Sequence, residues 1–223
     1  MKSNKIVLVS SLVLALSASY SASAFGLGGL MGGSSDSAKS GDISKDVETF
    51  LKTADDAHAL TSKSVEVLGE ALLTKEEIQK NSESLAAANK IQDPKEREAA
   101  IAKHEADVSA DLAKVNYEAK SKELAKSNDK KKTSQIGASM YNFVLGLLKD
   151  QELAGQGSGL ISSVSSNPMM AGKALKVKDV MASISGQLGN MGKIASGLQK
   201  LNSVIKTTPL PTSSAAAPVA AAD

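Results

Sequence analysis

IGASMYNFVLGLL, residues 136–148, is the most apolar stretch of the chain after residue 25. Its 13 residues are too few to cross a bilayer, which takes about 20 apolar residues in a helix. The stretch therefore predicts a buried central helix against which other amphipathic helices pack. We expect this helix to continue to Ala154 and to end at Gly155, a residue typical of helix C-termini.

The upstream segment, residues 43–73, has the heptad rhythm of a helix with one buried face. Small and apolar side chains recur there at steps of four and three: Ile43, Val47, Phe50, Ala54, Ala57, Thr61, Ser64, Leu68 and Ala71. The side chains in the middle of this seam are small, and the spacing of packed helices depends on the side chains at their contact. The sequence therefore predicts a close helix crossing near the middle of the segment.

The next region, residues 74–127, is highly charged and contains two helix starts. Thr74 with Glu77 forms a capping box, and Asp93 followed by Pro94 suits a second helix N-terminus. We expect helices over residues 75–91 and 94–127. Because the apolar line on the second helix is thin, the pair predicts a charged hairpin that projects from the bundle.

The region after the central helix is rich in glycine and serine. We expect a loop at residues 155–159, a short helix at 160–166 and a long last helix at 168–206 with a break near Gly172. The seam of the last helix is regular: Val177, Met181, Ile184, Leu188, Met191, Ala195 and Leu198. Interior glycines interrupt it, and they predict either close packing or reduced helicity: Gly186, Gly189, Gly192 and Gly197.

These patterns predict an all-α protein, an elongated helical bundle over residues 42–206 that carries the charged hairpin. Two flanking segments lack helical periodicity. Residues 25–41 are rich in glycine and serine and predict a flexible leader, whereas residues 207–223, TTPLPTSSAAAPVAAAD, predict a disordered low-complexity tail. The chain has no cysteine, so packing alone must hold the bundle.

Residues 1–24 have the three parts of a secretory signal peptide. Lys2 and Lys5 precede an apolar run, and Ala22-Ser23-Ala24 matches the small-residue cleavage site. The apolar run is too short for a spanning helix. We therefore expect cleavage after Ala24 and a periplasmic or secreted mature protein.

The motifs of common active sites are incomplete in this chain. His104-Glu105 begins like the zinc motif H-E-x-x-H, but Val108 stands where the second histidine is required. His58 is the only other histidine, and two histidines without a third ligand are a weak basis for a metal site. Around Ser158 the first glycine of G-x-S-x-G is replaced by Gln156. We therefore predict no catalytic, metal-binding or cofactor-binding residues.

The composition of the chain narrows the classes of molecule that it is expected to bind. Cleavage removes two lysines and leaves 24 basic residues against 24 acidic ones, and aromatic residues are only 3% of the chain. Neither the net charge nor the aromatic content favours nucleic acid. The favoured function is a non-enzymatic binding, scaffold or chaperone-like protein of the bacterial envelope, with protein partners.

The alternative function is a membrane-interacting protein, a lipid binder or pore former, that uses the apolar segments 136–148 and 177–205. Between residues 155 and 206 the chain has six lysines and a single acidic residue, Asp179. An amphipathic segment with this charge suits an anionic membrane surface or a groove on a partner protein. The ordinary alternative is a bundle helix whose lysines point outward.

Cleavage after Ala24 gives a first prediction. Mass spectrometry of the protein recovered from the cell envelope should find a mature N-terminus at Phe25, because the small residues at 22 and 24 follow the apolar run. Ala24→Arg should block cleavage at this position and leave the precursor. Envelope protein that retains Met1 in the unaltered chain would contradict the assignment of an export signal.

Overall fold

The computed structural model describes residues 40–127 and 129–220. The predicted signal peptide and nearly all of the predicted leader lie outside these residues. Six α-helices and a short 3₁₀ turn, η2, make up the described fold: α1 Ser40–Leu72, α2 Lys75–Asn89, α3 Pro94–Leu112, α4 Tyr117–Ser127, α5 Lys130–Ser165, η2 Pro168–Met170 and α6 Ala171–Ile205. The described residues contain no strand. The predicted all-α helical bundle is therefore confirmed.

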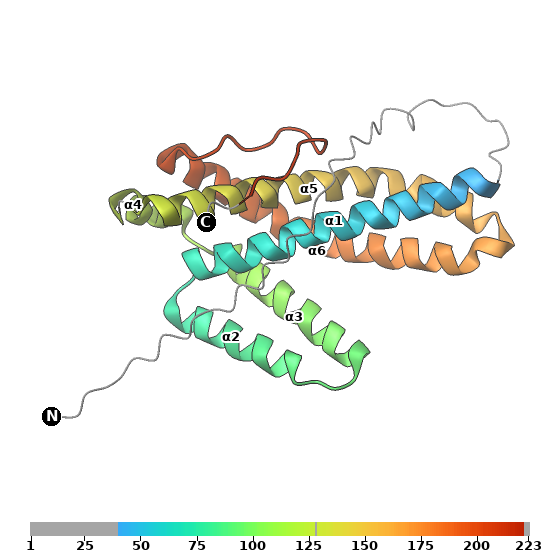
Figure 1. Cartoon of the computed structure of the whole chain (residues 1–223), viewed down its shortest axis with the longest axis horizontal. Helices are drawn as coiled ribbons and strands as arrows, with labels where there is room; N and C mark the ends of the chain where they lie inside the picture. The colour runs from blue at the N-terminus through green and yellow to red at the C-terminus, as the bar shows by residue number, and fades with distance from the viewer. Residues whose placement is uncertain (1–39, 128, 221–223) are drawn as a thin grey trace.

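The long helices α1, α5 and α6 form the body of the bundle (Figure 1). Two apolar clusters fill it. One joins the C-terminal half of α1 to the start of α5 and the end of α6, and it includes Leu68, Phe143 and Leu198, each fully buried. The other joins the start of α1 to the end of α5 and the start of α6, around Val47 and Val177. Helix α5 is thus antiparallel to both α1 and α6.

Helices α1 and α5 approach each other closely at Gly146 of α5. A Cβ atom built on Gly146 would lie 2.5 Å from Cγ2 of Thr61 and 3.1 Å from the carbonyl oxygen of Ala57. Ala57, Thr61 and Ser64 are all buried. The close crossing expected from the small residues of this seam is therefore present, and glycine on α5 makes it possible.

The projecting hairpin is shorter than expected. It consists of α2 and α3 alone, because the helix predicted over residues 94–127 breaks after Leu112 and restarts at Tyr117. Asn116 accepts a hydrogen bond from the backbone N–H of Ala119, and the Tyr117 ring packs on α6 where Gly197 has no side chain. Packing against α6 thus draws α4 away from the hairpin.

The prediction of a loop at residues 155–159 was wrong, because α5 continues as one helix to Ser165. Gly157 lies directly against Met181 of α6, and the flanking residues Leu153 and Val164 are buried in the second cluster. Tertiary packing therefore outweighs the low helix propensity of these glycines.

The predicted buried seam of the last helix is confirmed, but close packing is not present at every interior glycine. Among its interior glycines only Gly197 is crowded, by Tyr117, while Gly186, Gly189 and Gly192 have open space around them. Asn167 caps η2 ahead of Pro168, as the sequence indicates. Helix α6 itself begins at Ala171 and passes through Gly172 without a break.

Gly146 and Gly186 form a matched pair for testing the close crossing. Gly186→Ala should raise the free energy of unfolding by up to about 1 kcal/mol, because alanine favours helix and the site is open. Gly146→Ala should lower it by about 1–3 kcal/mol, because the new methyl group meets Thr61 and backbone. Chemical denaturation measures both. Equal stabilisation by the two substitutions would show that α1 and α5 are not in close contact there.

Candidate functional site

Helix α1 contacts both α3 and α5, and each of the three helices carries an ionisable side chain in this part of the bundle. We call His58, Glu105 and Asp150 the central junction. Nε2 of His58 lies 3.5 Å from a carboxylate oxygen of Glu105, so this pair joins α1 of the bundle to α3 of the hairpin. The Asp150 side chain, one turn beyond Gly146 on α5, is only 6% exposed.

Burial raises the pKa of Asp150 to about 6, while the charge of His58 acts in the opposite direction. Two other buried polar residues near this crossing, Thr61 and Ser64, donate their hydroxyl groups to carbonyl groups of their own helix. The result is a carboxyl group that titrates in mildly acidic conditions inside the bundle.

His104, beside Glu105 on α3, is half-buried, and its Nδ1 atom is enclosed without a hydrogen-bond partner. Both histidines of the sequence thus lie near the α1–α3 contact. Residues 40–127 and 129–220 nevertheless contain no group of three or more His, Asp and Glu side chains arranged to hold a metal ion. The junction therefore offers a buried carboxyl group and a contact between His58 and Glu105 that joins the hairpin to the bundle.

Sequence reasoning missed Asp150, although a signal for it exists. Gly146, Asp150 and Leu153 follow each other at steps of four and three, so they share one face of a helix. Extending the central seam beyond residue 148 would have placed a carboxyl group on a buried face. Ser158, the serine of the incomplete G-x-S-x-G pattern, lies on the exposed surface of α5.

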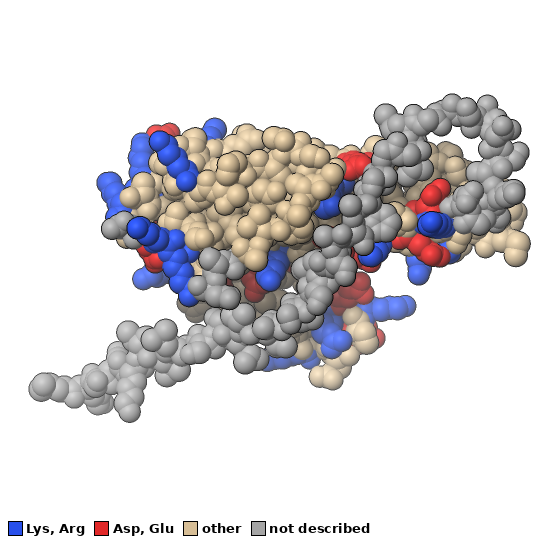
Figure 2. Space-filling model, turned by 45° about the horizontal axis from the view of Figure 1, so that its top comes forward, with Lys and Arg blue, Asp and Glu red and all other residues tan. Residues whose placement is uncertain are grey.

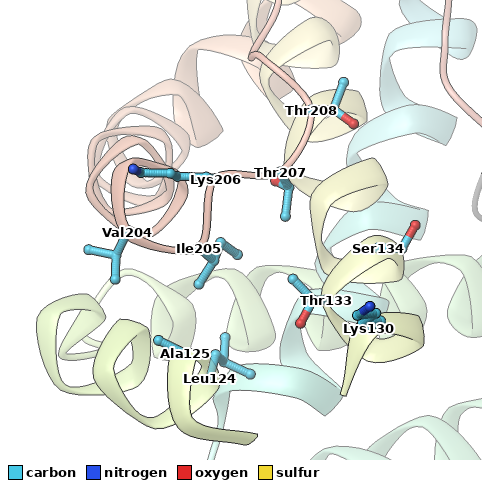
Figure 3. A pocket seen from close by; sticks show the side chains of 10 residues that line it. All are labelled: Leu124, Ala125, Lys130, Thr133, Ser134, Val204, Ile205, Lys206, Thr207 and Thr208. Carbon is cyan, nitrogen blue, oxygen red and sulfur yellow. The ribbon is translucent and has the colours of Figure 1, made fainter. Parts of the chain in front are cut away.

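A second candidate is an open hollow of about 470 Å³ at the end of the bundle where α4, α5 and α6 meet (Figure 3). Leu124 and Ala125 of α4, Lys130 and Thr133 of α5, and residues 204–208 at the end of α6 line it. The lining includes none of the central junction. The hollow lies at the point where the C-terminal tail leaves α6.

The apolar segments of the membrane alternative are in the core. In residues 136–148, Ile136, Met140 and Phe143 are at most 1% exposed. In residues 177–205, Val177 and Leu198 are fully buried. Just upstream of this segment, the basic residue Lys173 is paired with Glu48 of α1 at 2.9 Å. None of the described helices is long and apolar enough to span a membrane.

Comparisons of the chain with protein-family models, with curated proteins and with solved structures found no match. The functional argument therefore rests on the geometry of this chain alone.

The raised pKa of Asp150 predicts how stability depends on pH. The neutral form favours the fold below about pH 4, and this contribution is lost as the pH rises through about 6. At pH 7.5, Asp150→Asn should therefore be more stable than the parent by up to about 3 kcal/mol, at about 1.4 kcal/mol per pH unit, with little difference at pH 4.

Denaturant unfolding at pH 4, 5, 6 and 7.5 measures this dependence. Asp179→Asn, on the exposed surface of α6, is the control for the loss of one negative charge. A difference between the parent and Asp150→Asn that stays constant from pH 4 to pH 7.5 would contradict the raised pKa.

Proposed function

We propose that the protein is an exported, non-enzymatic binding or chaperone-like protein of the bacterial envelope, and that the α2–α3 hairpin is its surface for protein partners. The observation that carries the proposal is the projection of this hairpin from the bundle (Figure 1). Its helices lie away from α5 and α6 along most of their length, so both are accessible to a second molecule.

The hairpin buries little of its own apolar surface. Its only buried residues are Ala88, Val108 and Leu112. Val108 and Leu112 lie at the base of the hairpin and belong to the first core cluster. Toward the tip, Leu85, Ile91 and Ile101 remain half-exposed. A hairpin that leaves apolar side chains partly exposed among charged ones offers both parts of a protein interface, an apolar centre and a polar rim.

The charge of the hairpin favours protein over membrane. Residues 75–112 contain six basic and nine acidic side chains, a net charge of −3. An anionic lipid surface would repel this charge, whereas a basic or unfolded polypeptide would not. The base packs against the bundle through Leu112, and Glu105 contacts His58 of α1 there.

A photo-reactive residue at Ser82 tests the hairpin as the partner surface. Ser82 is exposed on α2, three residues before Leu85 and on the same helix face, so the residue should form covalent adducts with envelope proteins, identified by mass spectrometry. The double change Leu85→Arg and Ile101→Arg should reduce the adducts at least about tenfold, because charges in an apolar interface are costly. Its melting temperature should remain close to that of the parent.

Two controls accompany this experiment. A photo-reactive residue at Gln187, exposed on α6, should form few adducts, and Leu175→Arg, at a leucine 62% exposed on α6, should leave the Ser82 adducts unchanged. Adducts from both positions alike would contradict a specific hairpin surface. Salt-resistant sedimentation with anionic vesicles would favour the membrane alternative instead.

A further inference from the structure

The C-terminal tail, residues 207–220, lies without helix or strand over one side of α5 (Figure 1). The composition of this segment predicted disorder, but hydrogen bonds hold it at defined points. Ser214 donates to Glu152 at 2.5 Å, and Val219 then pairs with Asn142. These two α5 residues are about 15 Å apart along the helix axis, so the tail runs out along α5 and returns.

The root of the tail is firmly attached. Lys206 adopts a left-handed conformation with φ of 50°, which turns the chain at the end of α6. Asn202 accepts hydrogen bonds from the backbone N–H and the hydroxyl of Thr207 and donates one to the carbonyl of Thr208. Thr207 also fills the space beside Gly137 of α5. Beyond this root, the tail forms hydrogen bonds to α5 at Glu152 and Asn142.

The side chain of Asn142 binds the backbone of the tail. The amide nitrogen of Asn142 donates to the carbonyl of Val219 at 2.8 Å, and the amide oxygen accepts from the N–H of Val219 at 2.9 Å. The side-chain amide thus pairs with an extended residue as a neighbouring strand would. Such a pair recognises the backbone of any residue except proline, which lacks the N–H group.

The face of α5 along which the tail runs includes a buried leucine, although this face points away from the core. Leu145 stands two residues from both Phe143 and Leu147, about 200° around the helix from each of these core residues. Leu145 is nevertheless fully buried and belongs to neither core cluster. The tail hydrogen-bonds on both sides of it, at Asn142 and Glu152, so the tail covers Leu145. Figure 2 shows that the outer surface on this side of the molecule, where the tail runs, carries few charged side chains.

We propose that this face of α5, formed by Asn142, Leu145 and Glu152, is a binding site for extended peptide segments, and that the tail is its occupant in the free protein. The partner segment has the chemistry of the tail: uncharged, rich in alanine and proline, with an unpaired backbone N–H and C=O. This site lies apart from the hairpin and does not depend on the function proposed for it.

The test uses a labelled synthetic peptide with the sequence of residues 207–223 and full-length protein. The change Ser214→Ala with Val219→Pro removes the hydroxyl that donates to Glu152 and the N–H that donates to Asn142, but leaves α5 intact. This released-tail variant should bind the peptide at least about tenfold more tightly than the parent, because the site is no longer occupied. Fluorescence anisotropy gives the dissociation constants.

Two matched changes identify the site. Adding Asn142→Ala to the released-tail variant should abolish the gain, whereas Asn190→Ala, at a half-exposed asparagine of α6, should not. A peptide that carries proline at the position of Val219 should not bind. Circular dichroism confirms that each variant is folded.

The proposal is overturned if the folded released-tail variant binds the peptide no better than the parent, or if binding is indifferent to Asn142. Light scattering provides a further outcome. If the parent forms dimers that the released-tail change abolishes, the tail is exchanged with a second copy, and the proposed heterologous partner is wrong.

Discussion

The close contact of α1 with α5 at Gly146 determines the spacing of the bundle. The Ala57 carbonyl and the Thr61 methyl group occupy the space that a side chain on Gly146 would take. Because the two backbones lie close together there, large apolar side chains pack on either side of the crossing and form two separate clusters. The hydroxyl group of Thr61 is satisfied by the Ala57 carbonyl, so the crossing buries no unpaired hydroxyl.

The same crossing explains the ionisable junction. Asp150 follows Gly146 by one turn and so faces the narrow part of the bundle, where small side chains are the neighbours. Burial there raises its pKa, and the charge of His58 acts in the opposite direction. His58 in turn contacts Glu105 of the hairpin. The packing of the bundle and the attachment of the hairpin are therefore both close to His58.

Features that depend on neighbouring residues in the chain were predictable from the sequence. The capping box of Thr74 with Glu77 and the cap at Asp93 are present as expected. The heptad seam of α1 is buried from Val47 to Leu68. These succeeded because capping and helical periodicity are local properties.

Features that depend on distant residues were not predictable in the same way. The break between α3 and α4 requires the Tyr117 ring to fit beside Gly197, and the continuity of α5 requires Met181 to pack on Gly157. The pairing of Asn142 with Val219 joins residues 77 positions apart. No local rule indicates such contacts, and composition describes only how the tail behaves in isolation.

The tail is suited to exchange with another peptide because it forms no helix or strand of its own. Asn142 recognises the backbone, so side chains add little selectivity at that point. The entropic cost of ordering an extended chain therefore largely determines the affinity. Pro218 fixes its own φ and restricts Ala217, which lowers this cost next to the paired residue Val219. Since the root at Asn202 keeps the tail close to its site, a competitor in solution must be comparably preorganised. A proline immediately before the paired residue is therefore the feature that a competing peptide most needs.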